Sequence, residues 1–156
     1  MISVLIFLII SLIYNGYVID KYGVPVSLSD TAYLFGGNKR YLFTGYCYIS
    51  AFLLIPILME LVPSTLTFLP FLMCSGLLFS GASPFFKGNG LDKQVHYTSA
   101  IISFVSYFVF MILIMGLKWV VAFVSLFLML CIWKKECFIY FAEILAFSFI
   151  STFILL

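Results

Sequence analysis

Charged residues are so sparse in this chain that they leave long apolar segments between them. Only 9% of its 156 residues are charged, whereas 65% are hydrophobic. A soluble domain carries roughly 25% charged residues, which it needs on its water-facing surface. Because this chain lacks the side chains to cover such a surface, the sequence predicts that lipid surrounds most of it. The predicted fold class is all-α, a polytopic transmembrane helix bundle.

The spacing of the charges predicts about six membrane-spanning helices in a single transmembrane domain, residues 1–156. A helix needs about 20 apolar residues to cross the hydrocarbon core. The expected helices cover residues 1–19, 41–61, 64–82, 97–117, 118–133 and 137–156. No Lys or Arg precedes the first apolar run and no small-x-small site follows it, which favours a retained helix over a signal peptide.

The basic residues predict how the bundle is oriented. Seven of the eight Lys and Arg residues fall in the loops after the first, third and fifth helices: Lys21, Lys39, Arg40, Lys87, Lys93, Lys134 and Lys135. The positive-inside rule places such loops in the cytoplasm. We therefore expect a multi-pass protein of the cytoplasmic (inner) membrane, with both termini on the non-cytoplasmic side.

The first loop, residues 20–40, is long enough to contain a short helix. Ser27, Ser29 and Asp30 have side chains suited to cap such a helix at its N-terminus. The segment 33–35, Tyr-Leu-Phe, is amphipathic and is expected to lie on the membrane interface.

Polar side chains at membrane depth are the candidate functional residues, because they are costly there and usually face the bundle interior. His96 is expected to open the fourth helix, and Ser99 and Ser103 follow on the same helical face. Glu143 lies roughly 10 Å inside the last helix at 1.5 Å per residue, with Tyr140 on the same face. Most other polar residues of the helices fall in the same half of the bilayer.

This asymmetry predicts a polar pocket open to the cytoplasm, where His96 and Glu143 meet as a hydrogen-bonded pair and bind a small ligand, lipid or ion. A structural interpretation competes with it, since membrane helices also pack through small and hydroxyl residues. The serines of the fourth helix and the pair Gly76 and Ser80 fit such packing. Burial of Glu143 is costly unless it is protonated or paired, which favours a specific role.

The sequence favours a non-enzymatic protein, with no catalytic residue, cofactor or metal site predicted. It has one His and four cysteines without a CxxC pair, and no zinc, Walker or GxSxG motif. A net charge of +2 gives no reason to expect nucleic acid. The expected partners are the lipid bilayer and a small ligand or lipid, and oligomers are possible. The alternatives are a membrane-embedded lipid hydrolase and an oligomeric pore or membrane effector.

Four short segments carry a resemblance to known proteins: residues 24–33 (VPVSLSDTAY), 39–44 (KRYLFT), 81–87 (GASPFFK) and 95–100 (VHYTSA). In this combination the chain resembles a small family of uncharacterised multi-pass membrane proteins from Bacteroidetes and their phages, which implies no particular activity. It is also similar, more distantly, to the seven-helix membrane hydrolases that include alkaline ceramidases.

Those hydrolases use a Ser, an Asp and several His residues around zinc. This chain offers only His96 and lacks a seventh predicted helix, so the resemblance does not extend to the metal site or the activity. The resemblance implies a candidate ligand site that includes, in addition to His96, four further residues: Ser27, Ser29, Asp30 and Tyr33.

Overall fold

Helix is the only regular secondary structure in the part of the chain that the computed structural model describes, residues 2–35, 37–88, 90–133 and 135–156. This confirms the predicted all-α bundle. The α-helices are α1 (Ile2–Tyr22), α2 (Thr31–Leu34), α3 (Tyr41–Glu60), α4 (Phe68–Ala82), α5 (Leu91–Phe110), α6 (Leu117–Trp133) and α7 (Phe138–Leu155). Two 3₁₀ turns, η1 (Gly37–Arg40) and η2 (Ser64–Leu66), precede α3 and α4, and a π-helical turn, η3 (Met111–Met115), extends α5.

Five helical segments are long and apolar enough to cross a membrane: those that contain α1, α3, α4, α5 and α7. The sixth, α6, is apolar but has only 17 residues, roughly 25 Å of helix at 1.5 Å per residue. It buries a single side chain, Phe123, so most of its surface faces outward, as expected of a helix in lipid. By composition and fold this is a membrane protein.

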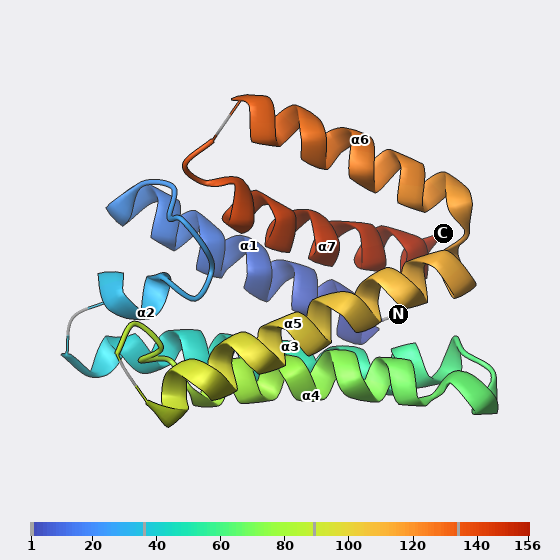
Figure 1. Ribbon diagram of the computed structural model, residues 1–156, viewed down its shortest axis with the longest axis horizontal. Coiled ribbons are helices and arrows are strands. Elements are labelled where there is room, and N and C mark those ends of the chain that lie inside the picture. The colour runs from blue at the N-terminus through green and yellow to red at the C-terminus, as the bar shows by residue number, and fades with distance from the viewer. Residues whose placement is uncertain (1, 36, 89, 134) are drawn as a thin grey trace.

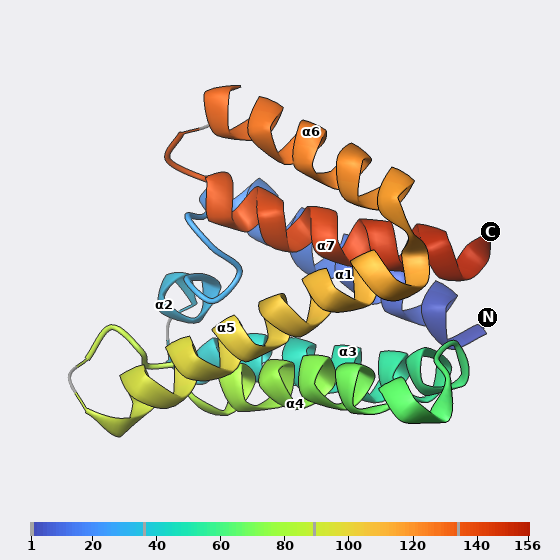
Figure 2. The same ribbon diagram turned by 45° about the vertical axis from the view of Figure 1, so that its right-hand side comes forward.

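The helices are arranged in two layers. Helices α3 and α4 lie side by side in one layer, α1 and α7 lie in the other, and α6 covers the outer side of α7 (Figures 1 and 2). Helix α5 packs along α4, and its extension η3 contacts α6. Figure 2 shows α5 rising from the α3–α4 layer at its start toward α7 at its end.

Most of the described basic residues gather at one end of this bundle, whereas Lys118 lies in the first turn of α6 at the other end (Figures 1 and 2). Lys21 lies in the last turn of α1, Lys39 and Arg40 lie in η1, and Lys87 and Lys93 flank the start of α5. Lys134 lies outside the described residues. The start of α1 and the end of α7 lie at the opposite end (Figures 1 and 2).

Helices α4 and α5 approach closely through small and hydroxyl residues. A Cβ atom at Gly76 would lie 2.5 Å from the Ser99 carbonyl oxygen and 2.7 Å from Ser103 Cβ. Ser80 Oγ and Ser99 Oγ are hydrogen-bonded at 2.9 Å. Ser103 Oγ donates to the Met73 carbonyl at 2.8 Å. The serines of α5 therefore do form a helix-packing face.

The start of α5 differs from the sequence-based expectation. The helix begins at Leu91 instead of residue 97, so His96 lies in its second turn and does not open it. Gly90, with a φ of 128°, ends the preceding loop. Asp92 occupies the first turn, where a negative charge interacts favourably with the helix dipole. Asp92 and Lys93 therefore belong to the helix, although their charges suggested a loop.

The first loop also departs from expectation in detail. The short helix α2 is present, but the Asp30 side chain at its N-cap position makes no capping hydrogen bond. Phe35 is 2% exposed and does not lie on the interface. Its ring packs edge-on against Tyr14 and Tyr22, at centroid distances of 6.1 and 5.6 Å. The loop folds onto α1, and this contact removes Phe35 from the surface.

Replacement of Gly76 by Ala tests the close approach of α4 and α5. The added methyl group would overlap the backbone of α5, and overpacking of this kind typically costs about 1–3 kcal/mol. We expect a lower midpoint of thermal unfolding in detergent. The matched control is Gly45→Ala in α3, where nothing lies within 4 Å of the new Cβ. An equal loss of stability in both variants would contradict the close contact.

Candidate functional site

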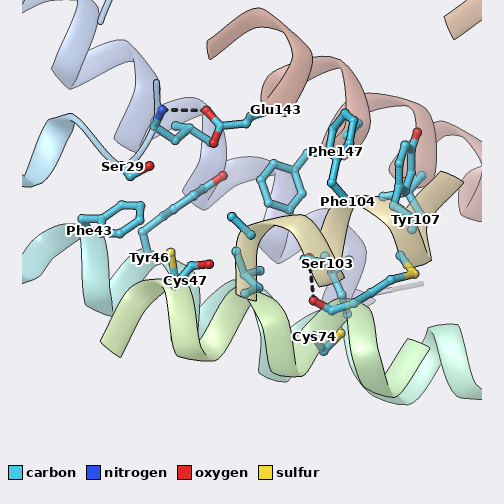
Figure 3. A pocket seen from close by; sticks show the side chains of 18 of the residues that line it. Ser29, Phe43, Tyr46, Cys47, Cys74, Ser103, Phe104, Tyr107, Glu143 and Phe147 are labelled. Carbon is cyan, nitrogen blue, oxygen red and sulfur yellow. Dashed lines mark hydrogen bonds between the residues drawn. The ribbon is translucent and has the colours of Figure 1, made fainter. Parts of the chain in front are cut away.

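A cavity of about 140 Å³ lies among α3, α4, α5 and α7 (Figure 3). Its volume is close to that of an engineered protein cavity of about 150 Å³ that binds benzene. Most of the 20 residues that line it are apolar or aromatic. It is thus far more apolar than the pocket predicted from the sequence.

The polar lining residues gather toward one end of the cavity. Ser29 belongs to the first loop, Ser80 to the last turn of α4, His96 to the second turn of α5 and Glu143 to the second turn of α7. All of these segments belong to the end of the bundle that carries the basic loops. The part of the cavity nearer the chain termini is lined by aliphatic side chains, among them Leu54, Leu58 and Ile150. The charged and imidazole groups therefore lie toward one end, and the rest of the lining is mainly apolar apart from hydroxyl groups such as those of Ser103 and Tyr107.

Glu143 connects the cavity to the first loop. Its Oε2 atom accepts a hydrogen bond from the Leu28 backbone N–H at 2.7 Å (dashed in Figure 3). A second contact follows close by, because the Tyr140 backbone N–H donates to the Val26 carbonyl at 3.0 Å. Residues 24–35, called here the capping loop, are thereby held against α7. Leu28 and Ser29 of this loop form part of the cavity wall.

The capping loop is also held on its other side. Thr31 Oγ1 donates to the Leu28 carbonyl at 2.6 Å and is hydrogen-bonded to the hydroxyl of Tyr14 on α1. The Tyr14 ring in turn stacks on Tyr46 of α3, at a centroid distance of 4.4 Å. The backbone of Leu28 thus has a hydrogen-bond partner at its N–H group, which is Glu143, and another at its carbonyl, which is Thr31.

His96 is 3% exposed and is fixed by backbone groups. Its Nδ1 lies 3.1 Å from the Ser80 carbonyl and 3.1 Å from the Ser83 carbonyl. Because carbonyl oxygens only accept, Nδ1 must carry the hydrogen. The ring stacks on Phe86, with centroids 4.1 Å apart and planes at 11°. In the described part of the chain, the expected hydrogen bond between His96 and Glu143 is not formed: His96 Nδ1 faces the Ser80 and Ser83 carbonyls, and Glu143 Oε2 accepts from the Leu28 N–H.

Asp30 and Tyr33 lie outside the cavity, at a hollow on the surface. The Lys87 ammonium pairs with Asp30 Oδ1 at 2.6 Å and lies 4.8 Å from the centroid of the Tyr33 ring. The Lys87 backbone N–H donates to the Tyr33 hydroxyl at 2.7 Å. These contacts join the capping loop to the loop between α4 and α5.

The remaining predicted residues divide between the cavity and its supports. Ser103 and Ser29 line the cavity. The Ser99 hydroxyl is hydrogen-bonded to the Ser80 hydroxyl. The Tyr140 hydroxyl donates to Asn15 Oδ1 at 2.8 Å. The Oγ atoms of Ser27 and Ser29 are hydrogen-bonded at 3.4 Å. Ser99, Tyr140 and Ser27 position their neighbours and do not line the cavity.

Sequence reasoning missed the aromatic part of the wall. Five rings line the cavity, from three helices: Phe43, Tyr46, Phe104, Tyr107 and Phe147. With 19 Phe and 10 Tyr in the chain, no pattern distinguishes these rings from those that face lipid. It also missed Leu28, whose contribution is a backbone N–H and so has no side-chain signal.

This arrangement is suited to binding. Among the described residues, no three His, Cys, Asp or Glu side chains gather where they could hold a metal ion. In the same part of the chain, the His96 ring is hydrogen-bonded to carbonyls and to no hydroxyl or carboxylate. What the site offers a ligand is an apolar space with a carboxylate and hydroxyl groups toward one end.

Comparisons with protein-family models, with curated proteins and with solved structures found no match to this chain.

Replacement of Glu143 tests its hold on the capping loop. Glu143→Ala leaves the Leu28 N–H without its acceptor, and an unsatisfied buried donor costs about 1–3 kcal/mol. Glu143→Gln retains an acceptor oxygen at the same reach. We expect faster hydrogen exchange over residues 24–35 in the Ala variant than in the Gln variant. Glu136→Ala, on an exposed residue before α7, is the control, and a similar increase there would refute the anchoring role.

Proposed function

We propose that this membrane protein binds a small ligand, with an apolar body and one polar group, in the cavity among α3, α4, α5 and α7. The observation that carries the proposal is the uneven lining, which is polar toward the capping loop and apolar farther along α3 and α7. Ligand pockets commonly combine a hydrophobic wall with a few convergent polar groups. Glu143 and His96 are the polar contacts, with Ser29 in the same part of the lining and Ser103 about two turns farther along α5.

The size of the cavity supports this proposal. In the core of a protein, an empty space destabilises the fold by about 24 cal/mol per Å³. On that scale, a void of about 140 Å³ costs on the order of 3 kcal/mol. A ligand that fills the space would offset this cost, whereas replacing Ala100 or Ala146 in the wall by larger residues would fill it permanently.

Binding is favoured over the two alternative functions by specific contacts. A lipid hydrolase built on His96 would need a nucleophilic hydroxyl bonded to the basic Nε2 atom of the ring, but among the described residues the hydrogen bonds of the ring run from Nδ1 to the carbonyls of Ser80 and Ser83. A pore through the bundle would need a continuous path, but Leu28 and Ser29 of the capping loop form part of the cavity wall.

We also propose that the chain crosses the cytoplasmic membrane six times, with the capping loop in the cytoplasm. Support comes from the basic residues Lys21, Lys39 and Arg40, which lie at the end of the bundle that carries the capping loop. Helix α6 is the short sixth crossing, and Trp119 and Trp133 lie near its two ends, as interfacial residues do. The polar end of the cavity then faces the cytoplasm.

The substitution Ala146→Phe tests occupancy of the cavity. A ring placed at this wall position fills the space and excludes a ligand. We expect wild-type protein in detergent to show a higher midpoint of thermal unfolding with benzene-sized ligands, and the variant to show no shift. Ala122→Phe, on an exposed position of α6, is the matched control and should retain the shift. Equal shifts in both variants would place binding elsewhere.

Reporter fusions test the proposed orientation. Alkaline phosphatase is active only outside the cytoplasm, whereas green fluorescent protein exported in unfolded form stays dark. After Leu156 we expect an active phosphatase fusion and a dark fluorescent one. After Gly88, in the loop between α4 and α5, we expect the reverse. Fluorescence at both positions would mean an odd number of crossings.

A further inference from the structure

We propose that the ligand of the cavity is a small organic cation, a protonated amine with a compact hydrocarbon body, whose ammonium group pairs with the carboxylate of Glu143. This inference rests on the proposed function, because it names the ligand class for the same cavity. Three features of the lining carry it: its charge, its aromatic rings and its size.

The charge of the lining is unbalanced. Among the described residues that line the cavity, Glu143 is the only formally charged one, and no Lys or Arg is present. Its Oε2 atom has a neutral partner, the Leu28 N–H. Lys87, a cation of the loop before α5, pairs with Asp30 outside the cavity. A carboxylate in an apolar interior is costly without a counter-charge, and an ammonium group in the cavity would supply that charge.

The aromatic rings favour the same class of ligand. Phe43 and Tyr46 of α3, Phe104 and Tyr107 of α5, and Phe147 of α7 surround the space. The face of an aromatic ring attracts a cation within about 6 Å of its centroid, and more strongly where water is excluded. In a cavity of about 140 Å³, a ligand of roughly six heavy atoms fills the volume. Its cationic group would then lie against these rings.

Other cations fit this lining less well. Metal ions such as Ca²⁺ and Mg²⁺ need about six or more oxygen ligands, whereas this wall offers one carboxylate and a few hydroxyl groups among apolar residues. A phospholipid headgroup could also present an ammonium group, but its phosphate would enter beside Glu143 with no Lys or Arg in the wall to receive it. The lining therefore favours a free amine.

Cyclopentylamine and cyclopentanol provide a matched pair of probes, because they share size and shape and differ in charge at pH 7.5. Binding is measured by calorimetry on the purified protein in uncharged detergent micelles, with empty micelles subtracted. We expect the amine to bind about tenfold to a hundredfold more tightly, since a charged hydrogen bond contributes about 1.5–3 kcal/mol. Glu143→Gln should remove this preference, and Glu136→Gln, at an exposed site, should retain it.

A second variant keeps the proposal testable if Glu143→Gln is too unstable to measure. Phe43→Leu removes one ring of the wall but preserves an apolar side chain. It should weaken binding of the amine severalfold and change binding of the alcohol little. A short-chain phosphatidylethanolamine should not compete with the amine. Competition by that lipid would overturn the assignment to a free amine.

The outcomes separate this inference from the proposed function. If cyclopentanol binds as tightly as the amine, the ligand is not a cation. If Glu143→Gln retains the preference for the amine, Glu143 does not pair with the ammonium group. Either result overturns the inference, and binding in the cavity still stands. If neither probe binds and neither shifts the unfolding midpoint of the wild-type protein, both the inference and the proposed cavity function are wrong.

Discussion

The hydrogen bond from the Leu28 backbone N–H to Glu143 is the contact that holds the capping loop in the wall of the cavity. Backbone groups buried away from water need partners, and a loop that enters a helix bundle brings such groups with it. Glu143 and the Tyr140 backbone, both on α7, satisfy Leu28 and Val26. The capping loop can then contribute a wall to a space that would otherwise open at its polar end. One carboxylate at membrane depth thus has a structural role before any ligand is considered.

The cavity itself follows from how unevenly the helices are packed. At Gly76 the backbone of α5 lies so close to α4 that no Cβ fits between them. Helix α7 instead packs on α6 and α1. Because α5 is held to one layer and α7 to the other, the space between them is bounded by side chains such as Phe104 and Phe147. The serines of α5 that suggested a ligand site act mainly in this packing, and Ser103 takes part in both.

The sequence predicts the helices well because the physical requirement is simple: apolar runs must be long enough to cross lipid. It predicts the start of α5 poorly, because Asp92 and Lys93 are polar residues in a helical turn. It identifies Glu143 and His96, since intramembrane polar groups are rare, and both line one cavity. Their partners were not predictable. Glu143 binds a backbone N–H 115 residues away, and no side chain marks that position.

Glu143 holds the capping loop through one oxygen, which raises the question of whether a ligand would displace the loop. An ionised carboxylate has two oxygens and about four acceptor positions. The Leu28 N–H occupies one position on Oε2, so an ammonium group can bind the carboxylate without breaking that bond. A ligand that binds only when Leu28 and Ser29 close the wall stabilises the closed loop by mass action. Under the proposed function, ligand binding would therefore reinforce the contact between the capping loop and α7 through the same side chain.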